Sequence, residues 1–253
     1  MKFYVGIHMP NWIPRMQIPF MVSRRILEKR KKLPRANVGY ALDSGGFTEL
    51  SKYGKWSQTP QQYTDIVHRI VDGVGRKPDF IAPQDSMCEP FICQKTKRTV
   101  EQHMVDTVEN FILLRQLVDT SLYVLPVIQG YTLNEYLQCI YLYEQYGIVL
   151  SQYPIVGLGS ICRRQKTKEG INIIQTIASM GISLHGFGLK TTALKEVSTN
   201  IASADSMAWS FAGRRIPNPS GKTKNLANDY GYMMKWYNTL KDSCEGLNEE
   251  ICC

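Results

Sequence analysis

Residues 39–74 read GYALDSGGFTELSKYGKWSQTPQQYTDIVHRIVDGV. It opens with a short apolar run, which predicts a strand ending at Asp43. The sequence SGG follows as a turn, because glycine tolerates the backbone angles that tight turns require. Thr59 before Pro60 is typical of a helix start and predicts a helix over 60–74. The stretch is therefore one strand–turn–helix unit.

The same alternation runs along the whole chain. Short apolar runs predict strands at 3–8, 39–43, 80–83, 123–128, 155–159, 184–188 and 202–206. Amphipathic stretches predict helices at 60–74, 99–117, 133–146, 170–180 and 226–240. Strands that alternate with helices indicate a parallel sheet.

We therefore expect an α/β protein with a single (β/α)8 TIM-type barrel, and a doubly wound open sheet is the alternative. The catalytic domain is expected to span residues 1–243, followed by a tail at 244–253. No GxGxxG follows the first strand and no GxxxxGK[ST] occurs, which disfavours dinucleotide-binding and P-loop folds.

The composition excludes several classes of protein. Apolar residues make up 43% of the 253 residues, enough for a substantial core. No apolar run approaches the roughly 20 residues that cross a bilayer, and the first residues lack the features of a signal peptide. We expect a cytoplasmic protein without a membrane partner. The seven cysteines are scattered and odd in number, which predicts reduced thiols and gives little support to a structural zinc site. No cofactor is expected.

Positive charge is clustered in a chain whose formal net charge is +8. The first cluster is RRILEKRKKLPR at 24–35, and the other two comprise Arg163, Arg164, Lys166 and Lys168, and Arg214, Arg215, Lys222 and Lys224. Such clusters suit contacts to phosphate groups, although solvated helix faces and loops have similar composition. The net excess favours a nucleic-acid partner.

Three acids stand at the ends of predicted strands, where barrel enzymes gather their functional residues. They are Asp43, Asp85 and Asp205. Acids rarely follow core strands unless they are paired, bind metal, cap a turn or do chemistry. Each acid alone has a simple structural alternative as a cap, but three together favour one polar pocket. Other polar or glycine positions at strand ends are Gln129, Gly130, Gly157, Gly159, His185 and Lys190.

Six blocks of sequence follow one another in a characteristic order. They are ALDSGGFTEL (41–50), PQDSMCEP (83–90), PVIQGYT (126–132), VGLGSICRR (156–164), LHGFGLKT (184–191) and SADSMAWSFAGR (203–214). From about residue 3 to 215 the chain resembles the queuine/archaeosine tRNA-guanine transglycosylase superfamily. It is most similar to the short, phage- and bacterium-associated DpdA-like branch, which places 7-deazaguanines in DNA.

The resemblance implies a ping-pong exchange of guanine in DNA for a free 7-deazaguanine base such as preQ0. Asp205 would be the nucleophile that attacks C1′ of the target nucleotide. Asp43 would be the acid/base that moves a proton on the departing and incoming bases. Asp85 would bind the Watson–Crick edge of the purine. Gln129 with Gly130 would bind its O6 side, and the backbone at Gly157 and Gly159 would also contact the base.

Further residues are assigned to binding. Ser44, Gly45, Phe47 and His185 are expected to shape the base pocket, although a histidine such as His185 is more often a core or pocket residue than a ligand. The target base must leave its stack to reach such a pocket, so basic residues would hold the flanking backbone. The residues expected to do so are Arg163, Arg164, Lys190, Arg214 and Arg215.

The chain departs from the superfamily pattern after the last strand. The stretch IPNPSGKTKNLANDYGY (216–232) lacks the cysteines of the superfamily zinc site, so zinc is expected to be absent. Few residues follow the DSMAWS block, which favours DNA over tRNA as the substrate. A tRNA transglycosylase, a glycosidase that releases a modified base and a binding subunit without activity stay open as alternatives. A homodimer and a partner subunit are both compatible with the sequence.

Overall fold

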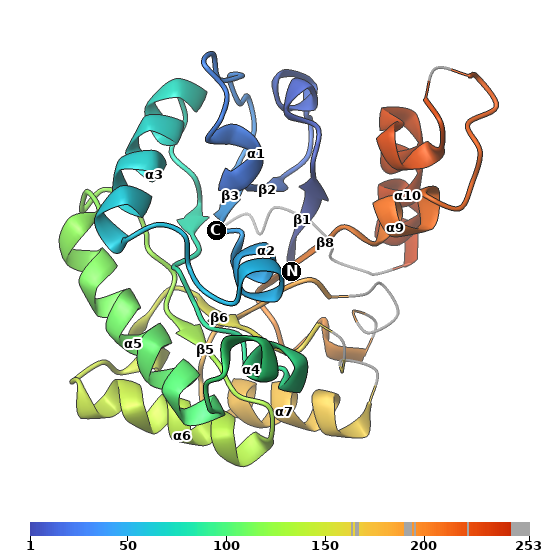
Figure 1. The fold of residues 1–253 in the computed structure, drawn as a ribbon. Helices are drawn as coiled ribbons and strands as arrows, with labels where there is room; N and C mark the ends of the chain where they lie inside the picture. Colours follow the sequence, from blue (N-terminus) through green and yellow to red (C-terminus); the bar gives the residue numbers. More distant parts are fainter. Residues whose placement is uncertain (163, 165–166, 190–193, 195, 222, 244–253) are drawn as a thin grey trace.

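Eight parallel strands form one curled sheet in the order β4-β3-β2-β1-β8-β7-β6-β5 (Figure 1). The computed structural model describes residues 1–162, 164, 167–189, 194, 196–221 and 223–243, so the predicted tail at 244–253 lies outside it. The strands are β1 (Lys2–Ile7), β2 (Phe20–Ser23), β3 (Tyr40–Asp43), β4 (Phe80–Ile81), β5 (Val127–Ile128), β6 (Val156–Leu158), β7 (Leu184–Gly186) and β8 (Ser203–Ser206).

This is the strand order of a TIM barrel cut between β4 and β5, and the prediction of a closed barrel is wrong. The two edge strands are joined only through the isolated parallel bridge between Ile81 and Val124. Pro126 stands between that bridge and β5, and proline has no N–H to donate to a ladder. The ladder is therefore interrupted here. The strand order does not reverse, as it would in a doubly wound sheet.

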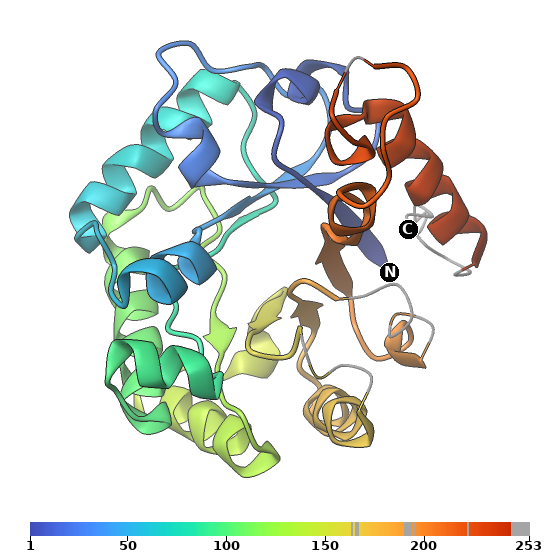
Figure 2. The same ribbon diagram turned by 45° about the vertical axis from the view of Figure 1, so that its right-hand side comes forward.

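Helices cover the outer face of the curled sheet, as the two ribbon views show (Figures 1 and 2). The helices in the described part of the chain are α1 (Arg24–Leu27), α2 (Gly46–Thr48), α3 (Pro60–Val74), α4 (Pro90–Thr96), α5 (Val100–Leu117), α6 (Leu133–Gln145), α7 (Lys168–Ser179), α9 (Ala208–Gly213) and α10 (Tyr230–Ser243). Shorter single turns are η1 (Pro10–Arg15), the π-helical η2 (Glu49–Tyr53), η3 (Leu150–Gln152) and η4 (Leu226–Asn228).

Capping explains where the long helices start. Thr59, Thr99 and Thr132 each accept a hydrogen bond from the backbone three residues on, and the side chain at that position bonds back. These reciprocal capping boxes precede α3, α5 and α6. The predicted helix at 226–240 is divided, because Asp229 accepts from the Tyr232 amide at 2.7 Å and so starts α10 after η4. Strand β2 is not predicted from the sequence, because it is only four residues long, between Pro19 and Arg24.

Two apolar clusters hold the layers together. The larger one lies between the sheet and the helices. The smaller one fills the inside of the curled sheet and comprises Tyr4, Met21, Ala41, Phe80, Leu125 and Val127. Side chains alternate between the two faces of a strand, so the two clusters are interleaved along each strand. In the part of the chain that the structure describes, no helix is long and apolar enough to cross a membrane.

Candidate active site at the carboxyl end of the sheet

Strand alternation carries the polar residues to one end of the barrel interior. Met21 and Ala41 point into the interior, so Ser23 and Asp43 point there as well, two residues further along β2 and β3. The carboxyl ends of parallel strands meet at the same end of a barrel. The interior at this end is therefore polar, above a layer of apolar side chains.

Asp43 lies in this polar end and begins the turn that the sequence predicts. Gly45 adopts φ +79°, and its amide donates to Asp43 Oδ2 at 3.0 Å. Burial raises the pKa of the Asp43 carboxyl, and the negative charge of Asp205 raises it further. Hydrogen bonds from Ser23 and Gly45 and the positive charge of Arg24 oppose this rise. The two acids therefore interact, although β3 and β8 are separated by two strands.

Asp85 is held by a network that joins three loops. The Gln129 amide donates to Asp85 Oδ2 at 2.5 Å, and the Ser160 hydroxyl lies 2.7 Å from Gln129 Oε1. The same hydroxyl lies 3.0 Å from Glu89 Oε2 and accepts from the Cys88 amide at 2.7 Å. Burial raises the pKa of Asp85 to about 7, the bond from Gln129 opposes this rise, and repulsion from Asp43 adds to it. Asp85 is thus poised to change protonation near neutrality.

Ser160 and Glu89 are absent from the residues predicted for the site. Ser160 is the residue after Gly159 and adopts φ +52°, a strained angle for a side chain other than glycine. That angle directs its hydroxyl to Gln129 and Glu89. The sequence offered one indication of Ser160, because it is the polar residue that follows the second glycine of the GLGS block at a strand end.

Close approach explains the glycines of the predicted pocket. A Cβ atom at Gly159 would lie 2.2 Å from Gln129 Nε2, and one at Gly130 would lie 2.7 Å from the Tyr136 amide nitrogen. A Cβ at Gly157 would lie 2.6 Å from the Phe187 ring. These positions therefore have no room for a larger residue. Gly159 makes room for Gln129, Gly130 for the start of α6 and Gly157 for the Phe187 ring.

Asp205 lies on β8, opposite Tyr4 of β1. Its Oδ1 accepts from the Gly188 amide at 2.9 Å and stands 3.4 Å from His185 Nε2. The Nε2 atom makes no well-aligned hydrogen bond, whereas Nδ1 lies 2.7 Å from the Ser203 hydroxyl. His185 is fully buried against the Phe80 and Phe187 rings. It thus lies beneath Asp205, below the open end of the interior.

The turn after Asp43 has its own support. Ser44 is buried, and its hydroxyl accepts from the Gly46 amide at 3.3 Å. Gly46 packs against the Trp56 ring, and a Cβ there would lie 3.4 Å from Asp85 Oδ1. Phe47 is 46% exposed and meets Phe91 of α4 edge to face, with ring centroids 6.3 Å apart. The turn thus reaches from Asp43 to the neighbourhood of Asp85.

Arg24 was grouped with the basic cluster at 24–35, but it is completely buried. Its Nε donates to the Ser44 carbonyl at 2.8 Å, and its Nη2 donates to Glu49 at 2.9 Å. Arg24 also pairs with Glu28, and Arg25 pairs with Glu49. The first two arginines of the cluster are therefore structural ion-pair partners. The sequence could have indicated the Arg24–Glu28 ion pair, because residues four apart on a helix lie next to each other.

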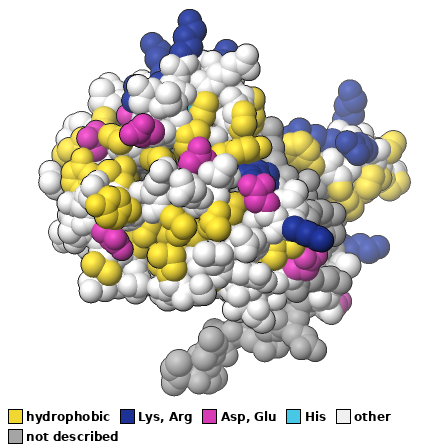
Figure 3. Space-filling view, turned by 90° about the horizontal axis from the view of Figure 1, so that it is seen from below, with side chains coloured by type: hydrophobic (Ala, Val, Ile, Leu, Met, Phe, Trp, Pro, Cys, Tyr) yellow, Lys and Arg dark blue, Asp and Glu magenta, His cyan; other side chains and the backbone are white. Residues whose placement is uncertain are grey.

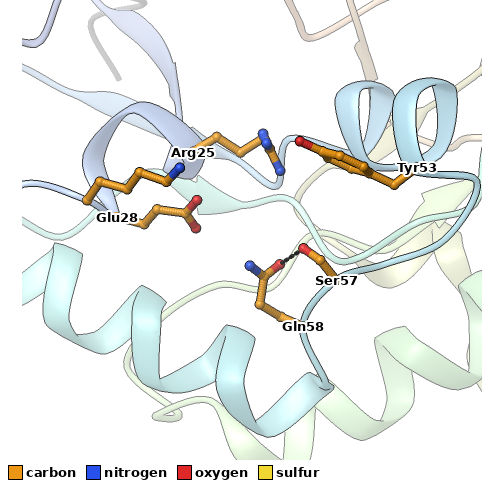
Figure 4. Close-up of a pocket in the computed structure, with 6 residues that line it drawn as sticks. Arg25, Glu28, Tyr53, Ser57 and Gln58 are labelled. Carbon is orange, nitrogen blue, oxygen red and sulfur yellow. Dashed lines mark hydrogen bonds between the residues drawn. The ribbon is translucent and has the colours of Figure 1, made fainter.

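A pocket of about 240 Å³ lies beside this ion-pair network (Figure 4). Its lining residues are Arg25, Glu28, Lys29, Tyr53, Ser57 and Gln58. Figure 4 shows the Arg25 guanidinium facing Tyr53 and the Gln58 amide oxygen bonded to the Ser57 hydroxyl. A larger pocket of about 380 Å³ lies between α5 and α6. Neither is lined by the three aspartates, which lie at the polar end of the barrel interior.

The predicted nucleic-acid contacts fall into three groups. Arg214 and Arg215 are exposed after α9. Figure 3 shows blue and yellow side chains together on the lobe at the right of the molecule. Arg164 is instead buried, donates to the Tyr131 carbonyl and pairs with Glu169 at 2.6 Å. It therefore braces the loop after β6. Arg163 and Lys190 lie outside the described residues.

The fold and site define a TIM-like α/β protein with coupled carboxyl groups at the carboxyl ends of its strands. Over residues 1–251 the sequence matches the family described as DpdA, DeoxyPurine in DNA protein A, and the chain belongs to this family. The family assigns it to the transglycosylases that modify purines in DNA. No curated protein sequence matches the chain. Within the described residues, no group of three His, Cys, Asp or Glu side chains could hold a metal ion.

Proposed function

We propose that the protein replaces guanine in DNA with a 7-deazaguanine base, preQ0 or a close relative, through a covalent Asp205–glycosyl intermediate. The observation that carries the proposal is the pair of interacting carboxyls, Asp43 and Asp205, at one end of the barrel interior. Residues 1–243 would form the catalytic domain. One carboxyl group that can transfer a proton and a second that can attack suit displacement at a sugar carbon.

Each carboxyl has a defined role in the proposed exchange. An Asp205 oxygen attacks C1′ as the bond from C1′ to N9 of guanine breaks, and its electron pair stays with the base. Asp43 supplies the proton that neutralises the departing base. Asp43 then removes the N9 proton of the incoming base, whose nitrogen attacks C1′ and releases the Asp205 carboxylate. The raised pKa of Asp43 supports this role, because a general acid must hold its proton near neutral pH.

Base recognition is assigned to Asp85 and Gln129. An ionised Asp85 accepts from the N1–H and N2–H groups of guanine. Gln129 Nε2 carries two protons, of which one is directed to Asp85, so the other can be donated to O6. The backbone at Gly157 and Gly159 is assigned to contact with the base, while Gly159 leaves room for the Gln129 amide and Gly130 keeps the Gln129 loop against α6. Ser44, Gly45 and Phe47 line the adjacent wall, and His185 supports Asp205 from below.

The test uses isotopically labelled 7-deazaguanine with duplex DNA, denatured DNA and tRNA in parallel. Label should enter DNA only, and a denaturing gel should show a protein–DNA adduct that is lost in Asp205→Asn. Asp65→Asn is the matched control, since Asp65 is exposed on α3. Label in tRNA alone would contradict the DNA assignment. Free guanine released from DNA without incorporation would mean hydrolysis in place of exchange.

A further inference from the structure

The tip of α9 presents an aromatic ring to solvent. Phe211 is 66% exposed, the highest fraction among the large hydrophobic side chains of the described residues. The Arg214 guanidinium lies over the ring, 4.6 Å from its centroid. Ile216, 40% exposed, follows at the end of the same segment. Exposed apolar groups beside arginine are typical of side chains that enter stacked bases.

The opposite face of α9 is firmly attached to the barrel. Trp209 is fully buried and its Nε1 donates to the Gly6 carbonyl of β1 at 2.9 Å. Gly213 lies so close to η4 that a Cβ would stand 2.7 Å from the Ala227 nitrogen. The Ser206 hydroxyl, at the end of β8, accepts from the Ala208 amide at 3.3 Å. Phe211 is therefore displayed on a fixed support.

The helix lies at the same end of the barrel as the three aspartates. It begins directly after β8, so Phe211 comes six residues after Asp205. Figure 2 shows the orange segment that contains α9 and the blue segment that contains α2 on different sides of this end. A nucleic acid whose target nucleotide enters between them would pass over α9.

The charge of this segment identifies the occupant as nucleic acid. Residues 206–228 contain Arg214, Arg215, Lys222 and Lys224 and no acidic residue. Phosphate groups complement this charge, and the stacked bases between them complement an exposed ring.

We propose that Phe211 is a wedge that enters the base stack of duplex DNA and takes the place of the extruded target base, while Arg214 binds a flanking phosphate. The inference rests on the proposed function, because an enzyme that binds its target nucleotide in an interior pocket needs that base out of the duplex. Unstacking a paired base has a free-energy cost that an inserted side chain offsets. A single-stranded substrate has no such cost, so the wedge should matter for duplex DNA alone.

The experiment compares the wild-type chain with Phe211→Ala, Phe211→Trp and Tyr141→Ala. Tyr141 is a matched control, since it is 61% exposed on α6. Each protein is given labelled 7-deazaguanine with plasmid duplex or the same DNA after heat denaturation. Phe211→Ala should lower incorporation into duplex by roughly tenfold or more and leave denatured DNA within about twofold. Phe211→Trp should retain activity on both, as should Tyr141→Ala.

A second readout does not depend on base exchange. Permanganate oxidises thymines that are unstacked, so wild-type protein should increase thymine reactivity in a bound mixed-sequence duplex and Phe211→Ala should not. Equal activity of Phe211→Ala and wild type on duplex would overturn the wedge, as would an equal loss on both DNA forms. If the wild type labels neither DNA, the proposed function fails, and the permanganate result alone then supports or overturns the wedge.

Discussion

Asp85 is a carboxyl group whose protonation changes in the physiological range. Burial raises its pKa to about 7, and the bond from Gln129 holds it from rising further. The raised pKa of Asp85 affects both the binding of a base and the stability of the fold. Both depend on the sign of the pKa shift, because an acid with a raised pKa is more easily kept neutral in the folded protein.

Gln129→Leu should weaken binding of free guanine at pH 7 and shift the binding profile to higher pH. The substitution removes the hydrogen bond that lowers the pKa of Asp85, so a smaller fraction of Asp85 is ionised and able to accept from the base. The measurement is calorimetric titration across roughly pH 5 to 9. Gln138→Leu, at an exposed position of α6, serves as the control. An unchanged pH midpoint would remove Gln129 from this role.

Asp85→Asn should stabilise the protein at pH 8 and leave its stability unchanged at pH 4. The folded protein holds the Asp85 proton more tightly than the unfolded chain, so stability is highest below the unfolded pKa of about 4 and falls as pH rises through about 7. Asparagine has no charge to bury, and the gain at pH 8 is about 1–4 kcal/mol. Urea unfolding at the two pH values measures it, with Asp65→Asn as the exposed control. Equal stability of Asp85→Asn and wild type at pH 8 would contradict the raised pKa.

Among the secondary-structure elements, the junction of α1, α2 and η2 supports the turn of Asp43. Arg24 begins α1 and reaches the Ser44 carbonyl, while Glu49 begins η2 and pairs with both Arg24 and Arg25. The turn is therefore held by an ion pair whose side chains are fully buried. Removing one partner of a buried pair leaves the other charge uncompensated, which costs more than loss of a surface pair.

Arg24→Met should lower the free energy of unfolding by about 3–5 kcal/mol. Arg98→Met is the matched comparison, because the Arg98–Asp106 pair is exposed, and it should cost about 1 kcal/mol or less. Denaturant unfolding measures both. At a temperature where Arg24→Met stays folded, base exchange should still fall, since the backbone next to Asp43 has lost its donor. Full activity in folded Arg24→Met would show that the turn keeps its geometry without the ion pair.

For the whole molecule, the net charge of +8 predicts DNA binding that weakens with salt. The structure divides the basic residues by role. Arg24 and Arg164 are buried and paired inside the protein, whereas Arg214 and Arg215 remain exposed after α9. Only the exposed members can exchange counterions for DNA phosphates.

Arg214→Gln and Arg215→Gln should each reduce the slope of log K against log salt by about 0.9 for duplex DNA. Fluorescence anisotropy at several salt concentrations gives this slope. Lys235→Gln, an exposed change on α10, should leave it unaltered. An unchanged slope in both arginine variants would place the DNA on another face.

From the sequence alone we could predict the α/β alternation, seven of the eight strands, the starts of α3, α5 and α6, and the aspartates at strand ends. These features are local, since apolar runs, capping residues and turn glycines act within a few residues of one another. Further properties needed the tertiary structure: the interruption at Pro126, the short strand β2, the burial of Arg24, the bracing by Ser160 and Glu89, and the raised pKa of Asp43 and of Asp85. Each depends on which distant segments pack together and exclude water, and the spacing of residues along one chain does not contain that information.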